Sequence, residues 1–231
     1  MLKNKMPAQK RLTQQQAFQR GAEHQFIDSI ELGPWTSYSL LKDPKHMGFV
    51  LARYKFCAKM LEGKENVLEV GCGDGFGIPI VAQAVKRVLG IDVDDRLIQG
   101  NRKRLAKIKN VQFKKMSICE QVPVGKFDAA YSVDVIEHLD RPLNAPFLEN
   151  QCRCLKPDGI CIIGTPNITA NKYASQRSRV QHINLKSHKT LRAQMEKYFR
   201  NVFMFSMNDE VLHTGYAPMG HYIFGMGVGL K

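Results

Sequence analysis

The stretch Val67-Leu-Glu-Val-Gly-Cys-Gly-Asp-Gly-Phe-Gly77 decides the fold of this chain. An apolar run, which is typical of a buried strand, leads directly into closely spaced glycines, and a stretch of helical spacing follows. Glycine lets the backbone turn tightly and leaves no Cβ between the backbone and a ligand. The stretch therefore predicts a strand, a loop and a helix in the arrangement of a nucleotide-binding site.

Short apolar runs alternate with stretches of helical spacing from residue 66 onward. The expected strands are 66–70, 87–91, 111–113, 127–133 and 159–164, and the expected helices are 76–85, 94–107 and 143–155. Strands that alternate with helices predict a parallel sheet with helices on both faces.

The end of the chain breaks this alternation. A helix expected at 187–198 is followed by two strand-like runs, 201–207 and 221–228, with no helical pattern between them. Two such strands pair antiparallel. We therefore predict an α/β, Rossmann-like sheet of seven strands, mostly parallel, which a C-terminal antiparallel hairpin completes.

The N-terminal part is predicted to form a helical cap ahead of the sheet. Helices are expected at 14–29 and 45–61, and the segment 32–44 between them is rich in turn residues and contains the only tryptophan. This divides the chain into a helical segment, 1–44, and a sheet domain, 45–231. The segment 32–44 forms either a lid over the carboxyl ends of the strands or a hydrophobic attachment through Trp35 and Tyr38, and both interpretations stay open.

Composition indicates where the protein is located, whether it binds a metal and what kind of partner its charge suits. No apolar run approaches the roughly 20 residues needed to cross a bilayer, and residues 1–20 lack the apolar core of a signal peptide, so we expect a cytoplasmic protein. The six cysteines are scattered without zinc-site spacing, and we expect no bound metal. The formal net charge of +13 indicates either a solvated basic surface or an anionic partner, such as nucleic acid or a phosphorylated or sugar-nucleotide substrate.

A second strand that ends in an acid supports the nucleotide-binding prediction. In Val88-Leu-Gly-Ile-Asp92 the carboxylate is placed to accept hydrogen bonds from both ribose hydroxyls of an adenosine ligand. Asp94 and Asp95 are better suited to begin and cap the next helix. The loop lacks the lysine and the serine or threonine of a Walker motif, which argues against an ATPase.

Four motifs occur in the order found in one large enzyme class. They are Val67-Leu-Glu-Val-Gly-Cys-Gly-Asp-Gly75, Gly90-Ile-Asp92, Phe127-Asp-Ala-Ala-Tyr-Ser-Val-Asp-Val-Ile-Glu-His-Leu139 and Leu155-Lys-Pro-Asp-Gly-Ile-Cys-Ile-Ile-Gly-Thr-Pro-Asn167. Together they resemble the class I S-adenosylmethionine-dependent methyltransferases, particularly the branch of ubiquinone-type O-methyltransferases and sugar and small-molecule methyltransferases. The resemblance covers roughly residues 45–231.

The resemblance implies S-adenosylmethionine as cofactor and a role for each matching residue. Glu69, Gly71, Cys72, Gly73 and Gly75 would surround the methionine end, Asp92 would bind the ribose, Val93 and Ile118 would lie at the adenine, and Ser132 would lie beneath the sulfonium. Ser117 stands where the family often has an acid that meets the adenine amino group. This contact is therefore expected to be weaker or to come from Cys119 or the backbone.

Two histidines are the candidate catalytic residues. Methyl transfer requires alignment of the acceptor and, for a hydroxyl acceptor, removal of its proton. His138 follows the fourth strand and, by analogy with the family, would either act as the base or instead cap or orient its loop. His182 follows the fifth strand and would line the acceptor pocket.

The function favoured by these features is methyl transfer from S-adenosylmethionine to a small-molecule acceptor, in particular a hydroxyl of a sugar, glycan precursor or other metabolite. The positive charge leaves an RNA methyltransferase as the alternative. The chain lacks both the Asn-Pro-Pro-Tyr type motif for exocyclic amines and the Pro-Cys nucleophile for pyrimidine carbons. A third possibility, a cofactor-binding partner without activity, is disfavoured by the intact glycine loop and Asp92.

Overall fold

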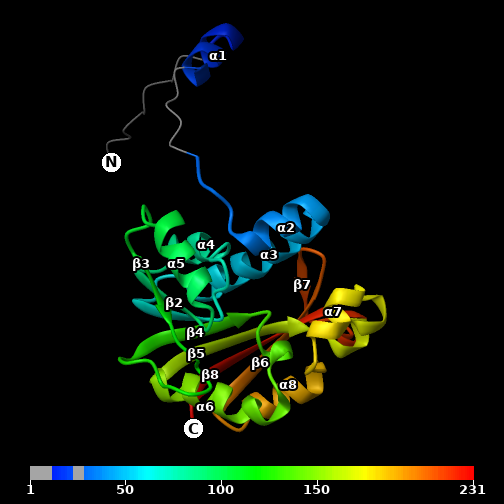
Figure 1. Ribbon diagram of the computed structural model, residues 1–231. Helices are drawn as coiled ribbons and strands as arrows, with labels where there is room; N and C mark the ends of the chain where they lie inside the picture. The colour runs from blue at the N-terminus through cyan, green and yellow to red at the C-terminus, as the bar shows by residue number, and fades with distance from the viewer. Residues whose placement is uncertain (1–11, 23–28) are drawn as a thin grey trace, which may run out of the picture. The chain divides into compact units, whose positions relative to one another are not determined.

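A computed structural model describes residues 12–22 and 29–231 (Figure 1). The chain divides into two compact units, Met1–Glu31 and Leu32–Lys231. In the first unit, helix α1 spans Gln14–Ala22, which confirms the first part of the helix expected at 14–29. Residues 23–28 of that prediction lie outside the described residues. Across the described part of the chain, no helix is both long and apolar enough to span a membrane.

The second unit is built on one sheet with the strand order β3-β2-β1-β4-β5-β8-β6-β7. The strands are β1 Asn66–Val70, β2 Arg87–Asp92, β3 Val111–Lys115, β4 Phe127–Val133, β5 Leu155–Pro166, β6 Phe199–Asn208, β7 Val211–His213 and β8 Tyr222–Leu230. Strands β1 to β5 pair parallel, whereas β8 pairs antiparallel with both β5 and β6. The predicted parallel sheet with antiparallel C-terminal strands is thus confirmed.

The prediction missed the short eighth strand, β7. It contains three residues and pairs with the end of β6 after a tight turn at Asp209, which has φ +50°. A run of three residues is too short to show the alternation by which a strand is recognised in sequence.

Helices cover both faces of the sheet (Figure 1). On one face lie α2 Pro34–Lys42, α3 Pro44–Met60, α4 Ile78–Ala82 and α5 Asp95–Arg104, and on the other lie α6 Asn144–Cys154 and α8 His188–Met195. Helix α7, Gln176–Gln181, and four short 3-10 turns, Ile136–His138, Arg141–Leu143, Ile168–Tyr173 and Ala217–Met219, belong to the connections. Val67 and Leu68 are fully buried in different cores because successive strand residues point to opposite faces.

The segment expected to be a turn-rich connection forms a helix instead. Pro34 and Pro44 occupy the first turns of α2 and α3. Proline is favoured there because its φ angle suits the helix and its missing N–H has no partner at that position. The same prolines that suggested turns therefore begin two consecutive helices, and α2 is part of the compact unit that starts at Leu32.

Strand β5 begins earlier than expected. It starts at Leu155 instead of 159, so α6 ends at Cys154. The pairing with β4 moves from Leu155 to Ile160 while β4 advances only from Phe127 to Ala129. The turn-like Lys-Pro-Asp-Gly sequence is thus accommodated as an irregularity within the strand.

Gly77 allows helix α3 to pack against the end of the glycine loop. A Cβ at this position would lie 2.1 Å from ring carbons of Tyr54, which is buried in α3. We therefore expect Gly77→Ala to lower the free energy of unfolding by about 1–3 kcal/mol, measured by urea denaturation.

The matched control is Gly100→Ala in the interior of α5. There a Cβ would meet only the guanidinium end of Arg104, which is able to move, and alanine favours a helix by about 0.5–1 kcal/mol over glycine. Equal stability of the two variants would contradict the packing role of Gly77.

Candidate active site

A cavity of about 730 Å³ opens at the carboxyl ends of the parallel strands. Val70, Asp92 and Val133, the last residues of β1, β2 and β4, all line it. The remaining walls come from the glycine loop, the loops after β2 and β3, the turn after β4, and residues of helices α2, α3, α5, α6 and α7. Open parallel sheets bind ligands at this edge.

The glycine loop has the backbone conformation that its sequence predicts. Gly71, Gly73 and Gly75 have φ angles of +73°, +51° and +73°, a region that side chains disfavour. The backbone amides of Gly71 and Cys72 donate to the carbonyl oxygen of Ile91 at 2.8 and 3.0 Å, which fixes the loop to β2. Gly71, Cys72 and Gly73 line the cavity, while Gly75 faces Asn101 and Leu105.

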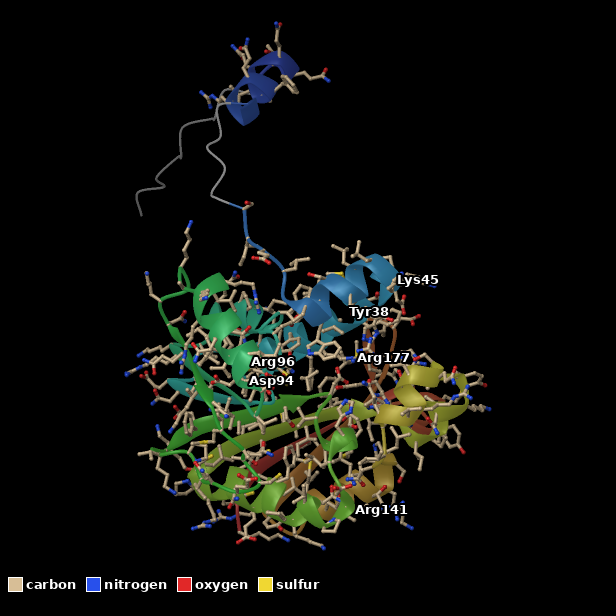
Figure 2. All side chains as sticks on the ribbon, in the orientation of Figure 1. Tyr38, Lys45, Asp94, Arg96, Arg141 and Arg177 are labelled. Carbon is tan, nitrogen blue, oxygen red and sulfur yellow. The ribbon has the colours of Figure 1, made fainter. Side chains whose placement is uncertain are left out.

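Asp92 joins the loop to the start of α5. Its Oδ2 accepts from the backbone N–H of Gly73 and its Oδ1 from that of Asp94, both at 2.9 Å. Each carboxylate oxygen has a second lone pair, so Asp92 is still able to accept from a ligand in the cavity. Asp94 instead caps α5, as the sequence predicted, and its side chain also pairs with Arg96 (Figure 2).

The wall beyond Asp92 is largely apolar. Val93 is 65% exposed and lines the cavity together with Leu97 and Ile118. Ser117 and Cys119 lie in the same wall. A flat aromatic ligand group suits this surface, and Ser117 supplies a hydroxyl where an acid is common in the resembling family.

Like Gly75, two other predicted cofactor residues, Glu69 and Ser132, do not line the cavity. Glu69 is 1% exposed and its Oε2 accepts from the hydroxyl of Tyr131 at 2.9 Å. Burial raises the pKa of Glu69 to about 8. Ser132 is fully buried, and its Oγ has no hydrogen-bond partner among the described residues. Neither side chain lines the cavity, so any influence on a ligand acts through the loop or through neighbouring residues.

Helix α2 is joined to the glycine loop by two buried hydrogen bonds that the sequence did not indicate. Asp74 accepts from the backbone N–H of Thr36 at 2.8 Å and from its hydroxyl at 3.0 Å. Trp35, Thr36 and Ser39 line the cavity. The partners are separated by 38 positions in sequence, so only the folded chain reveals the contact.

Arg177 of α7 lies beside α2 across the cavity mouth. Its guanidinium carbon is 5.0 Å from the ring centroid of Trp35 and 4.6 Å from that of Tyr38, and Figure 2 shows Arg177 next to Tyr38. Such cation–π contacts contribute about 0.5–1 kcal/mol at exposed sites. Helices α2 and α7 thus approach each other at the mouth, and Arg177 brings a positive charge to the cavity lining.

His138 and His182 lie together at the other end of the cavity. Their ring centroids are 5.0 Å apart, and His138 lines the cavity whereas His182 lies just behind it. Nδ1 of His138 is 3.1 Å from the carbonyl oxygen of Gln181. Because a carbonyl only accepts, Nδ1 carries a proton, and in the neutral imidazole the lone pair is then on Nε2. Burial, followed by the neighbouring His138, lowers the pKa of His182 and favours its neutral form.

Two acids stand beside the histidines. Asp134, with φ +58°, lines the cavity and accepts from a guanidinium N–H of Arg53 at 2.6 Å. Glu137 is fully buried, and its Oε2 accepts from the hydroxyl of Thr165 at 3.0 Å. Burial raises the pKa of Glu137 to about 8. One ligand atom each of Glu137, His138 and His182 lies within 4.8 Å of the others, so this group is able to hold a metal ion.

Residues 45–199 match the family model of the methyltransferase domain. The chain belongs to this family. The match confirms the resemblance drawn from the four motifs, and S-adenosylmethionine is the cofactor of this domain. The cavity fits that cofactor, because Asp92 retains acceptor capacity beside an apolar wall.

The relatives differ in what their names say they act on. A probable S-adenosylmethionine-dependent methyltransferase of Mycolicibacterium smegmatis is 33% identical over 116 residues, which are 49% of this chain and 42% of the relative. A tRNA U34 carboxymethyltransferase of Actinobacillus succinogenes is 31% identical, covering 49% of this chain and 39% of the relative. A ubiquinone biosynthesis O-methyltransferase of Dechloromonas aromatica is also 31% identical, covering 49% of each.

The chain therefore spans less than half the length of these curated relatives. Among solved structures, the methyltransferase domain of bacterial CtHen1-C superposes with a TM-score of 0.66 at 20% identity, covering 78% of this chain and 99% of that one. This likeness confirms the methyltransferase fold.

Asp92 is predicted to contribute directly to cofactor affinity. We expect Asp92→Ala to weaken binding of S-adenosylhomocysteine by at least about tenfold, since a hydrogen bond to a charged group contributes about 1.5–3 kcal/mol. Isothermal titration calorimetry measures this affinity.

The control is Asp94→Ser, which keeps a residue that caps helices while removing the ion pair with Arg96. It should bind S-adenosylhomocysteine as the unaltered protein does. A loss of affinity as large as that of Asp92→Ala would show that helix disruption, and not the Asp92 carboxylate, is responsible.

Proposed function

We propose that this protein transfers a methyl group from S-adenosylmethionine to a hydroxyl of a small-molecule acceptor, such as a sugar, a glycan precursor or another metabolite. The observation that carries this proposal is that Asp92 with the glycine loop and the free Nε2 of His138 belong to one cavity. Its volume of about 730 Å³ lies within the range of about 300–1,000 Å³ for small-molecule sites.

Each group in the wall of the cofactor half contacts a different part of S-adenosylmethionine in this proposal. Asp92 accepts hydrogen bonds from the ribose, and Val93 and Ile118 pack against the adenine. The loop from Gly71 to Gly73 approaches the methionine end without obstruction by side chains. When bound, S-adenosylmethionine supplies a methyl group on a positively charged sulfur, which is already a good leaving group.

The acceptor half aligns and deprotonates the acceptor. Nε2 of His138 accepts the hydroxyl proton, and the Gln181 carbonyl keeps the ring in the required tautomer. Trp35 and Arg177 restrict water at the mouth, and Arg177 favours an acceptor that carries a phosphate or another anionic group. His182 lies behind the cavity lining, where its ring packs against that of His138 and supports its position.

Replacement of His138 is expected to separate turnover from cofactor binding. His138→Ala should lower turnover by about 10²–10⁴ and leave the affinity for S-adenosylhomocysteine nearly unchanged. The assay follows transfer of a labelled methyl group into the small-molecule fraction of a cell extract. His188→Ala, on the first residue of α8 and outside the cavity lining, is the control and should retain activity. Full activity of His138→Ala would assign His138 a structural role only.

RNA methylation is the second candidate because of the net charge and the tRNA-modifying relative. Part of the positive charge is already used internally, since Arg102 donates to the carbonyl of Phe113 and Arg104 to that of Asp74. Lys103 and Lys114 are exposed and available to phosphates.

If RNA is the acceptor, affinity for a tRNA transcript should fall by about 10³ or more between 50 and 200 mM salt, as it does when six or more phosphates are contacted. Lys103→Glu with Lys114→Glu should weaken that binding while calorimetry shows unchanged S-adenosylhomocysteine affinity. Methyl transfer into RNA under these conditions would overturn the small-molecule proposal. Absence of S-adenosylhomocysteine binding would overturn both.

A further inference from the structure

Three side chains with metal-binding atoms converge at the acceptor end of the cavity. Glu137 and His138 belong to the 3-10 turn after β4, and His182 is the C-terminal cap residue of α7. One ligand atom from each lies within 4.8 Å of the other two. The sequence spacing did not suggest a metal site, because His182 is distant from the other two residues along the chain.

One side-chain oxygen of Glu137 lacks a hydrogen-bond partner, and a bound ion would interact with it. The residue is 0% exposed, and only Oε2 has a partner, the hydroxyl of Thr165. Oε1 is buried without a hydrogen-bond partner among the described residues. A buried carboxylate oxygen without a partner is costly, so such a group in a folded protein requires an explanation.

No neighbouring cation supplies that partner. Arg53 donates to Asp134 instead, and the Nζ of Lys186 donates to the side-chain oxygens of Asn144 and Asn184 at 3.2 and 2.6 Å. The position beside Oε1 is therefore left for a group that the described residues do not provide.

The imidazole of His138 is arranged as a metal ligand commonly is. The Nδ1–H of His138 donates to the carbonyl of Gln181, and a metal-bound histidine almost always donates its other ring N–H in this way. Nε2 of His138 is consequently free to bind an ion. Because His182 directly follows Gln181, the same backbone segment orients both rings.

From this geometry we infer that Glu137, His138 and His182 bind one divalent first-row transition-metal ion at the acceptor end of the cavity. Two nitrogen ligands and one carboxylate suit such ions better than magnesium or calcium, which prefer oxygen alone. Three protein ligands leave coordination positions open. His138 lines the cavity, so the ion would lie beside the space for the acceptor.

The ion's part in catalysis rests on the proposed hydroxyl methylation. An acceptor hydroxyl that binds the ion has a lower pKa, and its proton passes to solvent. The oxygen then forms the new O–CH3 bond while the sulfur of the donor keeps the electron pair of the broken S–CH3 bond. In this reaction Nε2 of His138 binds the ion instead of accepting the proton. The ion thus replaces the imidazole base, and His138 and His182 position the acceptor through it.

Manganese binding by the whole chain tests the site without any acceptor. Protein treated with a chelator and then dialysed is titrated with Mn²⁺, and electron paramagnetic resonance counts the free ion. Mn²⁺ is a suitable probe because it binds thiols poorly, so the cysteines do not compete. We expect one saturable Mn²⁺ per chain and a higher unfolding temperature with the ion than without it.

Variants assign the ligands. His182→Ala and Glu137→Gln should each weaken Mn²⁺ binding by at least about tenfold, a loss that even an outer-shell partner can cause. His188→Ala should bind Mn²⁺ normally. His182 is only partly buried, so its variant keeps the test valid if Glu137→Gln fails to fold.

The two proposals fail in different ways. Absence of saturable Mn²⁺ binding, or binding that His182→Ala leaves unchanged, overturns the metal site even if S-adenosylhomocysteine still binds and hydroxyl methylation is observed. Normal Mn²⁺ binding by a protein that does not methylate small molecules would retain the site and overturn the proposed function.

Discussion

The Asp92 carboxylate is the interaction on which the cofactor half of this structure depends. Strands β1 and β2 run parallel with Val70 opposite Ile91, so both strands end at the same edge of the sheet. The glycine loop must then turn back with left-handed backbone angles, and the amides of Gly71, Cys72 and Gly73 all donate to the last two residues of β2. Asp92 accepts a hydrogen bond from the backbone amide of Gly73 and another from that of Asp94, the residue that precedes α5. A single side chain thereby joins the two segments that form the cofactor wall.

Further polar contacts extend this arrangement away from the sheet edge. Asp74 continues the loop and accepts two hydrogen bonds from Thr36, both buried, so the position of α2 depends on the loop being in place. Beneath the loop, Glu69 and Tyr131 satisfy each other within the apolar core. A buried polar group without a partner would destabilise the fold, so these pairs constrain the loop from both sides.

The features of the site that could be predicted from the sequence are those formed by residues close together in the chain. The glycine loop and Asp92 were recognised because strand, turn and acid are close in sequence and each has a strong local preference. Helix α2 was missed because proline is common both in turns and at helix starts. The Thr36–Asp74 pair, Arg177 over Trp35, and the convergence of His182 on Glu137 join segments distant in sequence, and no local pattern encodes such contacts.

A different set of hydrogen bonds holds the turn after β4 in the acceptor half of the cavity. The amide of Asp134 donates to Gly164, the hydroxyl of Thr165 donates to Glu137, and the amide of Asn184 donates to the carbonyl of Glu137. None of these bonds involves the glycine loop or Asp92. The turn after β4 is therefore hydrogen-bonded to β5 and to the segment after α7, while Val135 in the same turn packs against Gly71 of the cofactor loop. Changes in that segment can alter the acceptor pocket while the cofactor wall stays intact, which is the arrangement expected of a family whose members share a donor and differ in their acceptors.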